Sequence, residues 1–102
     1  MQHFLVMAFD GNDPEAGARR QAVRSAHFER IKPVVENRQL LAAGAILSEG
    51  GAMMGSSFIA AFPNREALEE WIAEDPYTKN NVWQRVEIRP FRLAVLDGRI
   101  MP

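Results

Sequence analysis

Some stretches of the chain have the pattern of apolar residues that is typical of strands, and others have the three- and four-residue spacing that is typical of helices. Together they predict four strands and two helices. Bulky apolar residues run almost without interruption over residues 3–9, which is typical of a strand covered on at least one face. Turn-forming residues 10–14 follow, with Asp13 as a helix N-cap and Pro14 as the first helical residue. Apolar residues spaced three and four apart then predict a helix that runs to about Arg38.

A hairpin follows this helix. Residues 40–47 predict a second strand, in which Gly44 marks a bulge or a close approach of other atoms. Residues 48–52 form a glycine-bearing turn, and residues 53–62 return as a third strand. Asn64 then caps a second amphipathic helix that ends near Glu74.

The end of the chain predicts one more strand. Asp75 precedes Pro76, and the residue before a proline is pushed out of the helical region, so the second helix stops there. Residues 76–81 have room for one further turn, and residues 82–95 predict a long fourth strand. Asp97 and Gly98 indicate a late turn, followed by a tail too short to form an element.

The order strand, helix, strand, strand, helix, strand is typical of a ferredoxin-like α+β sandwich, βαββαβ, with an antiparallel sheet and two helices on one face. We expect a single domain over residues 1–102, with a short tail from about residue 96. A sheet this apolar is not expected to leave its other face in water. The sequence therefore predicts a homodimer packed sheet to sheet.

The amino-acid composition limits the binding partners, the cellular location and the kinds of site that we expect. A net charge of −1 gives no global reason to expect nucleic acid or an anionic membrane. The apolar start lacks a basic leader and meets Asp10 too soon for a signal peptide or a membrane span. The chain has no cysteine, which excludes disulfides and thiol nucleophiles and is compatible with the cytoplasm, where we expect the protein. His3 and His27 lie in different elements, so no metal site is predicted.

The first helix holds the strongest functional signal. At about 100° per residue, reactive and apolar side chains share one arc, which we expect to be the buried one. Buried cationic side chains need partners or a cleft. Two alternatives stay open: a core histidine satisfied by a backbone carbonyl, and surface arginines paired with nearby acidic residues. The residues of the arc are Arg20, Val23, Arg24, His27, Ile31 and Val34.

The chain resembles the YCII-related (YciI-like) family of the dimeric α/β-barrel superfamily. The resemblance depends on several short motifs whose order and spacing together are fairly specific. It covers nearly the whole chain and implies a ferredoxin-like fold, a dimer and an active site in which a histidine and an aspartate act together. The motifs are Arg20, Arg24 and His27, then Ala43-Gly44, Gly55, Asp75-Pro76-Tyr77 and residues 86–91.

Six residues are candidates for the site, and the resemblance implies the roles of two of them, His27 and Asp75. His27 and Asp75 match the catalytic pair, in which the carboxylate would hold the imidazole in one tautomer. As an alternative or an additional role, Asp75 is a natural N-cap. Arg20 and Arg24, with Arg24 nearer His27, are candidates for binding an anionic group. Ser48 near the hairpin is a candidate substrate-binding residue, and so is Tyr77, which lies beside Asp75 and which we expect to offer its hydroxyl to the pocket.

These residues favour a cofactor-independent enzyme that uses His27 and Asp75 for acid–base chemistry, an isomerisation or an elimination, on a small cyclic or aromatic-derived anion. Haem and flavin are not expected, because the chain has no histidine besides His27 and His3. The rival hypothesis is a non-catalytic dimeric module that binds a small ligand or another protein. Glutamine in place of His27 separates the two hypotheses, because only an enzyme has turnover to lose.

Overall fold

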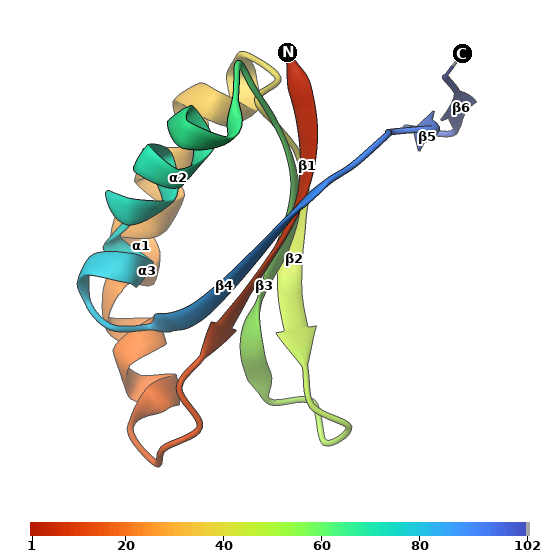
Figure 1. Ribbon diagram of the computed structural model, residues 1–102. Coiled ribbons are helices and arrows are strands. Elements are labelled where there is room, and N and C mark those ends of the chain that lie inside the picture. The colour runs from red at the N-terminus through yellow and green to blue at the C-terminus, as the bar shows by residue number, and fades with distance from the viewer. Residues whose placement is uncertain (102) are drawn as a thin grey trace.

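The computed structural model describes residues 1–101, so the last residue of the predicted domain, 102, lies outside the described part. It has two layers, a four-stranded antiparallel sheet and helices that cover one of its faces (Figure 1). The element order confirms the predicted ferredoxin-like α+β fold. The elements are β1 (Gln2–Asp10), α1 (Ala16–Glu36), β2 (Leu40–Leu47), β3 (Met53–Phe62), α2 (Arg65–Ala73), α3 (Pro76–Lys79) and β4 (Trp83–Pro90).

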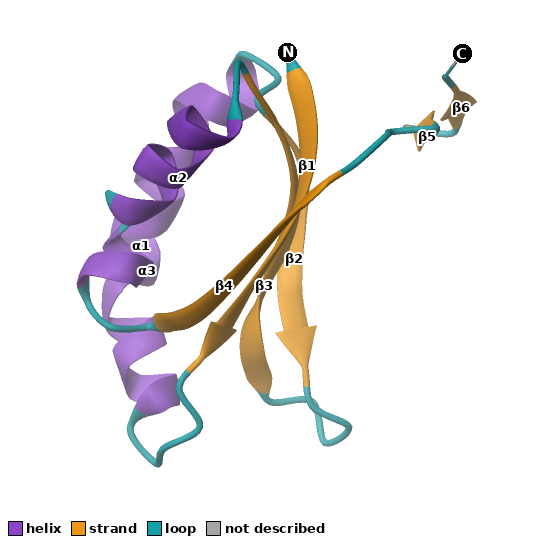
Figure 2. Ribbon diagram, in the orientation of Figure 1, coloured by secondary structure: helices purple, strands orange, loops and turns teal. Residues whose placement is uncertain are grey.

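The strand order is β2-β3-β1-β4, so β1 and β3 lie in the centre of the sheet. Alternate residues of β1, Phe4, Val6 and Ala8, are buried in the core under the helices. The residues between them point to the opposite face, because side chains alternate along a strand. Figure 2 shows no helix over that opposite face. The sheet therefore has a covered face and an open face.

The first helix begins later than predicted. It starts at Ala16 rather than at Pro14, and Glu15 at its N-cap makes no side-chain cap hydrogen bond. The Asp13 carboxylate instead accepts from the Glu15 N–H and forms a two-pronged ion pair with Arg19. These bonds stabilise a turn before the helix, because short acidic side chains readily bind backbone groups near them. Asn64 caps α2 as predicted, accepting from Ala67 N–H at 2.8 Å.

The C-terminal prediction was wrong in two respects. The fourth strand ends at Pro90 instead of Val95, since the chain leaves the sheet there. The tail does form an element, a hairpin of β5 (Val95–Leu96) and β6 (Arg99–Ile100) around Asp97 and Gly98. Both turn residues have positive φ, 52° and 73°, as a tight hairpin turn requires. Residues 94–101, here called the C-terminal arm, extend away from the sheet (Figure 1).

The close approach predicted at Gly44 lies elsewhere. A side chain added at Gly44 would meet nothing within 4 Å, and the register shifts of β2 flank it, near Leu40 and near Leu47. The close approach is at Gly55, where a Cβ atom would collide with the carbonyl oxygen of Ala8 in β1. Among residues 1–101, no helix has the length and apolar character needed to cross a membrane.

Candidate active site

His27 and Asp75 are in direct contact. His27 projects from the middle of α1, and Asp75 is the N-cap residue of α3. The His27 Nδ1 atom lies 2.9 Å from one Asp75 carboxylate oxygen and 3.0 Å from the other. An ionised carboxylate only accepts hydrogen bonds, so Nδ1 donates to Asp75, and in the neutral ring Nε2 is the nitrogen without a proton. That tautomer presents Nε2 as a proton acceptor.

Asp75 is fully buried and has more than one partner. It accepts from the Tyr77 backbone N–H at 2.9 Å, so it caps α3 while it holds the imidazole. It also lies 3.1 Å from the Arg30 guanidinium, which donates to the Trp71 carbonyl oxygen and lies over the Trp71 ring. A buried carboxylate is costly without cationic partners, and Arg30 supplies a permanent one. The positive charge of Arg30 therefore balances the negative charge of the buried Asp75 carboxylate.

Aromatic rings fix the orientation of His27. The Tyr77 ring stacks on the imidazole at a centroid distance of 4.1 Å, and the Trp83 ring meets it edge-on at 5.7 Å. Tyr77, the predicted substrate-binding residue beside Asp75, borders the pocket, and its backbone N–H also binds the Asp75 carboxylate. Burial raises the pKa of the Tyr77 phenol above its ordinary value, so the hydroxyl stays protonated at neutral pH.

Arg20 is already occupied by protein groups. Its guanidinium binds both oxygens of Asp10 at 2.9 and 3.0 Å and the Ser56 hydroxyl at 2.8 Å. Burial raises the pKa of the Asp10 carboxyl, and the Arg20 guanidinium opposes that shift. Trp83 adds a second bond to Ser56, from its indole N–H at 3.1 Å. This network joins α1 to β1, β3 and β4, and it makes Arg20 a poor candidate for binding a ligand.

Arg24 is the better candidate for anion binding. The hydrogen bonds and ion pairs among residues 1–101 include none from its guanidinium, which lies 4.6 Å over the Phe28 ring. Ser48, in contrast, does not line the pocket. Its hydroxyl accepts from the Ala52 N–H within the β2–β3 turn. Ser56 is the serine that faces the pocket, and strand register, which the residues alone did not reveal, puts it there.

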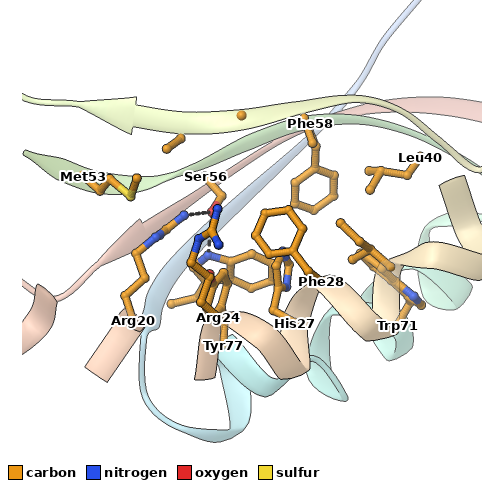
Figure 3. Close-up of a pocket in the computed structure, with 15 residues that line it drawn as sticks. Arg20, Arg24, His27, Phe28, Leu40, Met53, Ser56, Phe58, Trp71 and Tyr77 are labelled. Carbon is orange, nitrogen blue, oxygen red and sulfur yellow. Dashed lines mark hydrogen bonds between the residues drawn. The ribbon is translucent and has the colours of Figure 1, made fainter. Parts of the chain in front are cut away.

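Four of the six predicted site residues line a pocket between α1 and the sheet (Figure 3), and these are Arg20, Arg24, His27 and Tyr77. Its volume is about 250 Å³, which suits a small ring compound. The small residues of β2 leave room for it. Arg24 also borders a neighbouring hollow, and this position places its charge at the boundary between the two. The other lining residues are Phe28, Ile31, Leu40, Ala43, Gly44, Ala45, Met53, Ser56, Phe58, Trp71 and Trp83.

Comparison with known structures supports the fold. A dehydrochlorinase of 5-chloro-2-hydroxyhydroquinone from Burkholderia phenoliruptrix AC1100, TftG, solved with 2,5-dihydroxybenzoquinone, superposes with a TM-score of 0.78. It is 20% identical and covers 88% of this chain and 93% of its own. An antibiotic biosynthesis monooxygenase has a TM-score of 0.51 at 18% identity, over 91% of this chain and 98% of its own.

Sequence comparison identifies the family. Residues 2–92 match the model of the YCII-related domain. An uncharacterized protein of Haemophilus influenzae is 36% identical over 96 residues, which cover 88% of this chain and 96% of that protein. Protein YciI of Escherichia coli is 34% identical over 94 residues, covering 86% and 96%. The match spans nearly the whole chain, and we conclude that the chain belongs to the YCII-related family.

Proposed function

We propose that this protein is a small cytoplasmic enzyme that needs no cofactor and transfers a proton to or from a cyclic or aromatic-derived anion, with isomerisation or elimination as the outcome. The observation that carries the proposal is the buried Asp75 carboxylate on Nδ1 of a pocket-lining histidine. This arrangement leaves Nε2 free to act as a base, and it stabilises the imidazolium that forms when Nε2 takes a proton.

The chemistry follows from the charges around the pocket. Nε2 of His27 would take a proton from a ring carbon next to a carbonyl group, and the electrons of the broken C–H bond would form an enolate. Arg24 would balance the negative charge that develops. In an isomerisation the proton returns to another carbon. In an elimination the electron pair instead forms a new C=C bond as a leaving group departs with its own pair.

The structural neighbour TftG supports this substrate class. Its name describes the removal of chlorine from a hydroxylated ring, and its complex holds a hydroxylated quinone. The pocket of the present chain is walled by Phe28, Phe58 and Trp83, and aromatic walls favour a planar ring. A hydroxylated quinone or its chlorinated precursor is therefore the first compound class to test.

Proton exchange tests the proposal without knowledge of the final product. We expect the protein, incubated in D₂O with a panel of hydroxylated and chlorinated hydroquinones and quinones, to catalyse exchange of a ring proton or release of chloride. Proton NMR measures the exchange, and a chloride electrode measures the release. Saturable binding of a panel member with neither reaction, across the whole panel, would support the non-catalytic binding module instead.

We also propose that the protein is a homodimer packed through its open sheet faces. Leu5 and Ile59 are paired in the register of β1 and β3 and point away from the helices, as do Met7 and Phe9. Figure 1 shows the C-terminal arm leaving the sheet on this same side. The arm exposes Val95 and Ile100, at 60% and 86%. Apolar surfaces on one side of a molecule favour burial against a second copy.

Sedimentation equilibrium tests the dimer. We expect a mass twice that of the 11.5 kDa chain at micromolar concentration. Ile59→Arg would place a charge in the centre of the open face and shift the mass toward that of the monomer. Val35→Arg is the matched control, because Val35 is an exposed apolar residue on α1, and it should leave the mass unchanged. A monomeric parent protein in this concentration range would contradict the dimer.

A further inference from the structure

We infer that the Ser56 hydroxyl is a fixed hydrogen-bond donor to an oxygen atom of the bound ligand, and that the ligand is a ring enolate or phenolate. Ser56 lies on β3 and is only 8% exposed, and Figure 3 shows it directed toward the space that Arg24 and His27 also border. The inference rests on the proposed function only in taking this pocket as the ligand site.

The hydrogen-bond partners of Ser56 Oγ leave its hydroxyl proton free to be donated to a ligand. A hydroxyl group has one proton to donate and two lone pairs that accept. Arg20 and Trp83 both bind Ser56 Oγ, at 2.8 and 3.1 Å, and guanidinium and indole N–H groups can only donate. Both lone pairs are therefore used. The hydrogen bonds among residues 1–101 give the Ser56 proton no acceptor, so its partner has to come from the pocket.

The surroundings of Ser56 strengthen this donor and leave space in front of it. Arg20 is charged, and a hydroxyl that accepts from a cation becomes a stronger donor itself. Ser56 lies opposite Ala8 on β1 and Ala45 on β2, whose small side chains leave room for a ligand atom beside Oγ. The Arg20–Asp10 ion pair and Trp83 hold the hydroxyl in place before a ligand arrives.

Three groups would then recognise one ligand. Ser56 would donate to the enolate or phenolate oxygen, Arg24 would supply the opposite charge, and His27 Nε2 would face the ring carbon that exchanges its proton. A hydroxyl donor favours an acceptor oxygen and leaves an apolar substituent unbonded. This explains why the compound class would be an oxygenated ring anion, and not simply any aromatic molecule that fits the volume.

Binding of a simple ring enolate tests the assignment. The probe is the enolate of 1,3-cyclohexanedione, with its Kd measured by calorimetry on the full chain. We expect Ser56→Ala to weaken binding by about tenfold or more, the range for a hydrogen bond to a charged group. Ser56→Thr keeps the hydroxyl and should keep most of the affinity. Ser57→Ala is the matched control, because Ser57 is the next residue and donates to the Val6 carbonyl oxygen instead.

Each outcome decides between the alternatives. If Ser56→Ala binds the enolate as tightly as the parent protein, the donor assignment is wrong. If the parent protein shows no saturable binding at millimolar enolate, the ligand class is wrong. Should Ser56→Ala fail to fold, Ser56→Cys, with a weak donor of similar size, replaces it with the same expected loss. Binding through Ser56 without any proton exchange would contradict the proposed enzyme and leave this inference standing.

Discussion

Glutamine in place of His27 is expected to lower turnover by about 10²- to 10⁴-fold, the usual contribution of a general acid–base group. Glutamine cannot take up a proton at neutral pH, yet its amide N–H can still donate to the buried Asp75 carboxylate. Arg30 and the Tyr77 N–H also remain bound to Asp75, so the fold should survive. The measurement is kcat/KM for the compound found by proton exchange, with circular dichroism as the check on folding.

His3→Gln is the matched control, because His3 is the other histidine and lies on β1 outside the pocket. It should change turnover by less than a factor of about two. Asp75→Asn should also lose turnover, since an asparagine NH₂ group facing Nδ1 would favour the other tautomer and place the proton on Nε2. Full activity of His27→Gln would eliminate the proposed acid–base pair. Unchanged ligand affinity in a protein without any turnover would favour the binding module.

The parts of the fold that were predictable have strong local signals. The bounds of β2 and β3 match the predicted strands because turn residues delimit both, and Asn64 is a good N-cap in sequence as in structure. The start of α1 was misplaced because Asp13 offered a helix cap and a turn equally well. The ion pair between Asp13 and Arg19 favours the turn over the helix cap, and the geometry of that ion pair depends on the folded chain.

The candidate site was only partly predictable. The helical arc selected His27 and Arg24, but the distance between His27 and Asp75 along the chain conceals their contact, and the family resemblance alone connected them. Arg30 was missed, although its place three residues after His27 put it within reach of the same partner. Their roles in catalysis stay predictions until turnover is measured.

Ser56 shows the limit of sequence patterns most clearly. Ser56 and Ser57 are adjacent, and only strand register decides which of them faces the helices. The arc of α1 that was predicted to be buried faces the sheet, and Arg24 is its one exposed residue. Arg20 is buried because Asp10 and Ser56 are there to receive it, and Arg24 has no such partners among residues 1–101.

Alanine in place of Gly55 is expected to destabilise the protein by about 3 kcal/mol or more, because the added methyl group would meet backbone and not a mobile side chain. A Cβ atom there would collide with the Ala8 carbonyl oxygen and lie 3.2 Å from the Phe9 Cα atom. Neither can move without parting β1 from β3, the two central strands. The unfolding midpoint should fall by about 15 °C in a domain of this size.

Gly17→Ala is the matched control, since the same substitution on α1 meets nothing within 4 Å. It should stabilise the protein by about 0.5–1 kcal/mol, because alanine favours a helix over glycine. Gly55 also precedes Ser56, so the close approach of β1 and β3 sets the position of the pocket hydroxyl. A Gly55→Ala protein that melts like the parent would show that β1 and β3 can separate. The Arg20–Ser56–Trp83 network would then lack its rigid support.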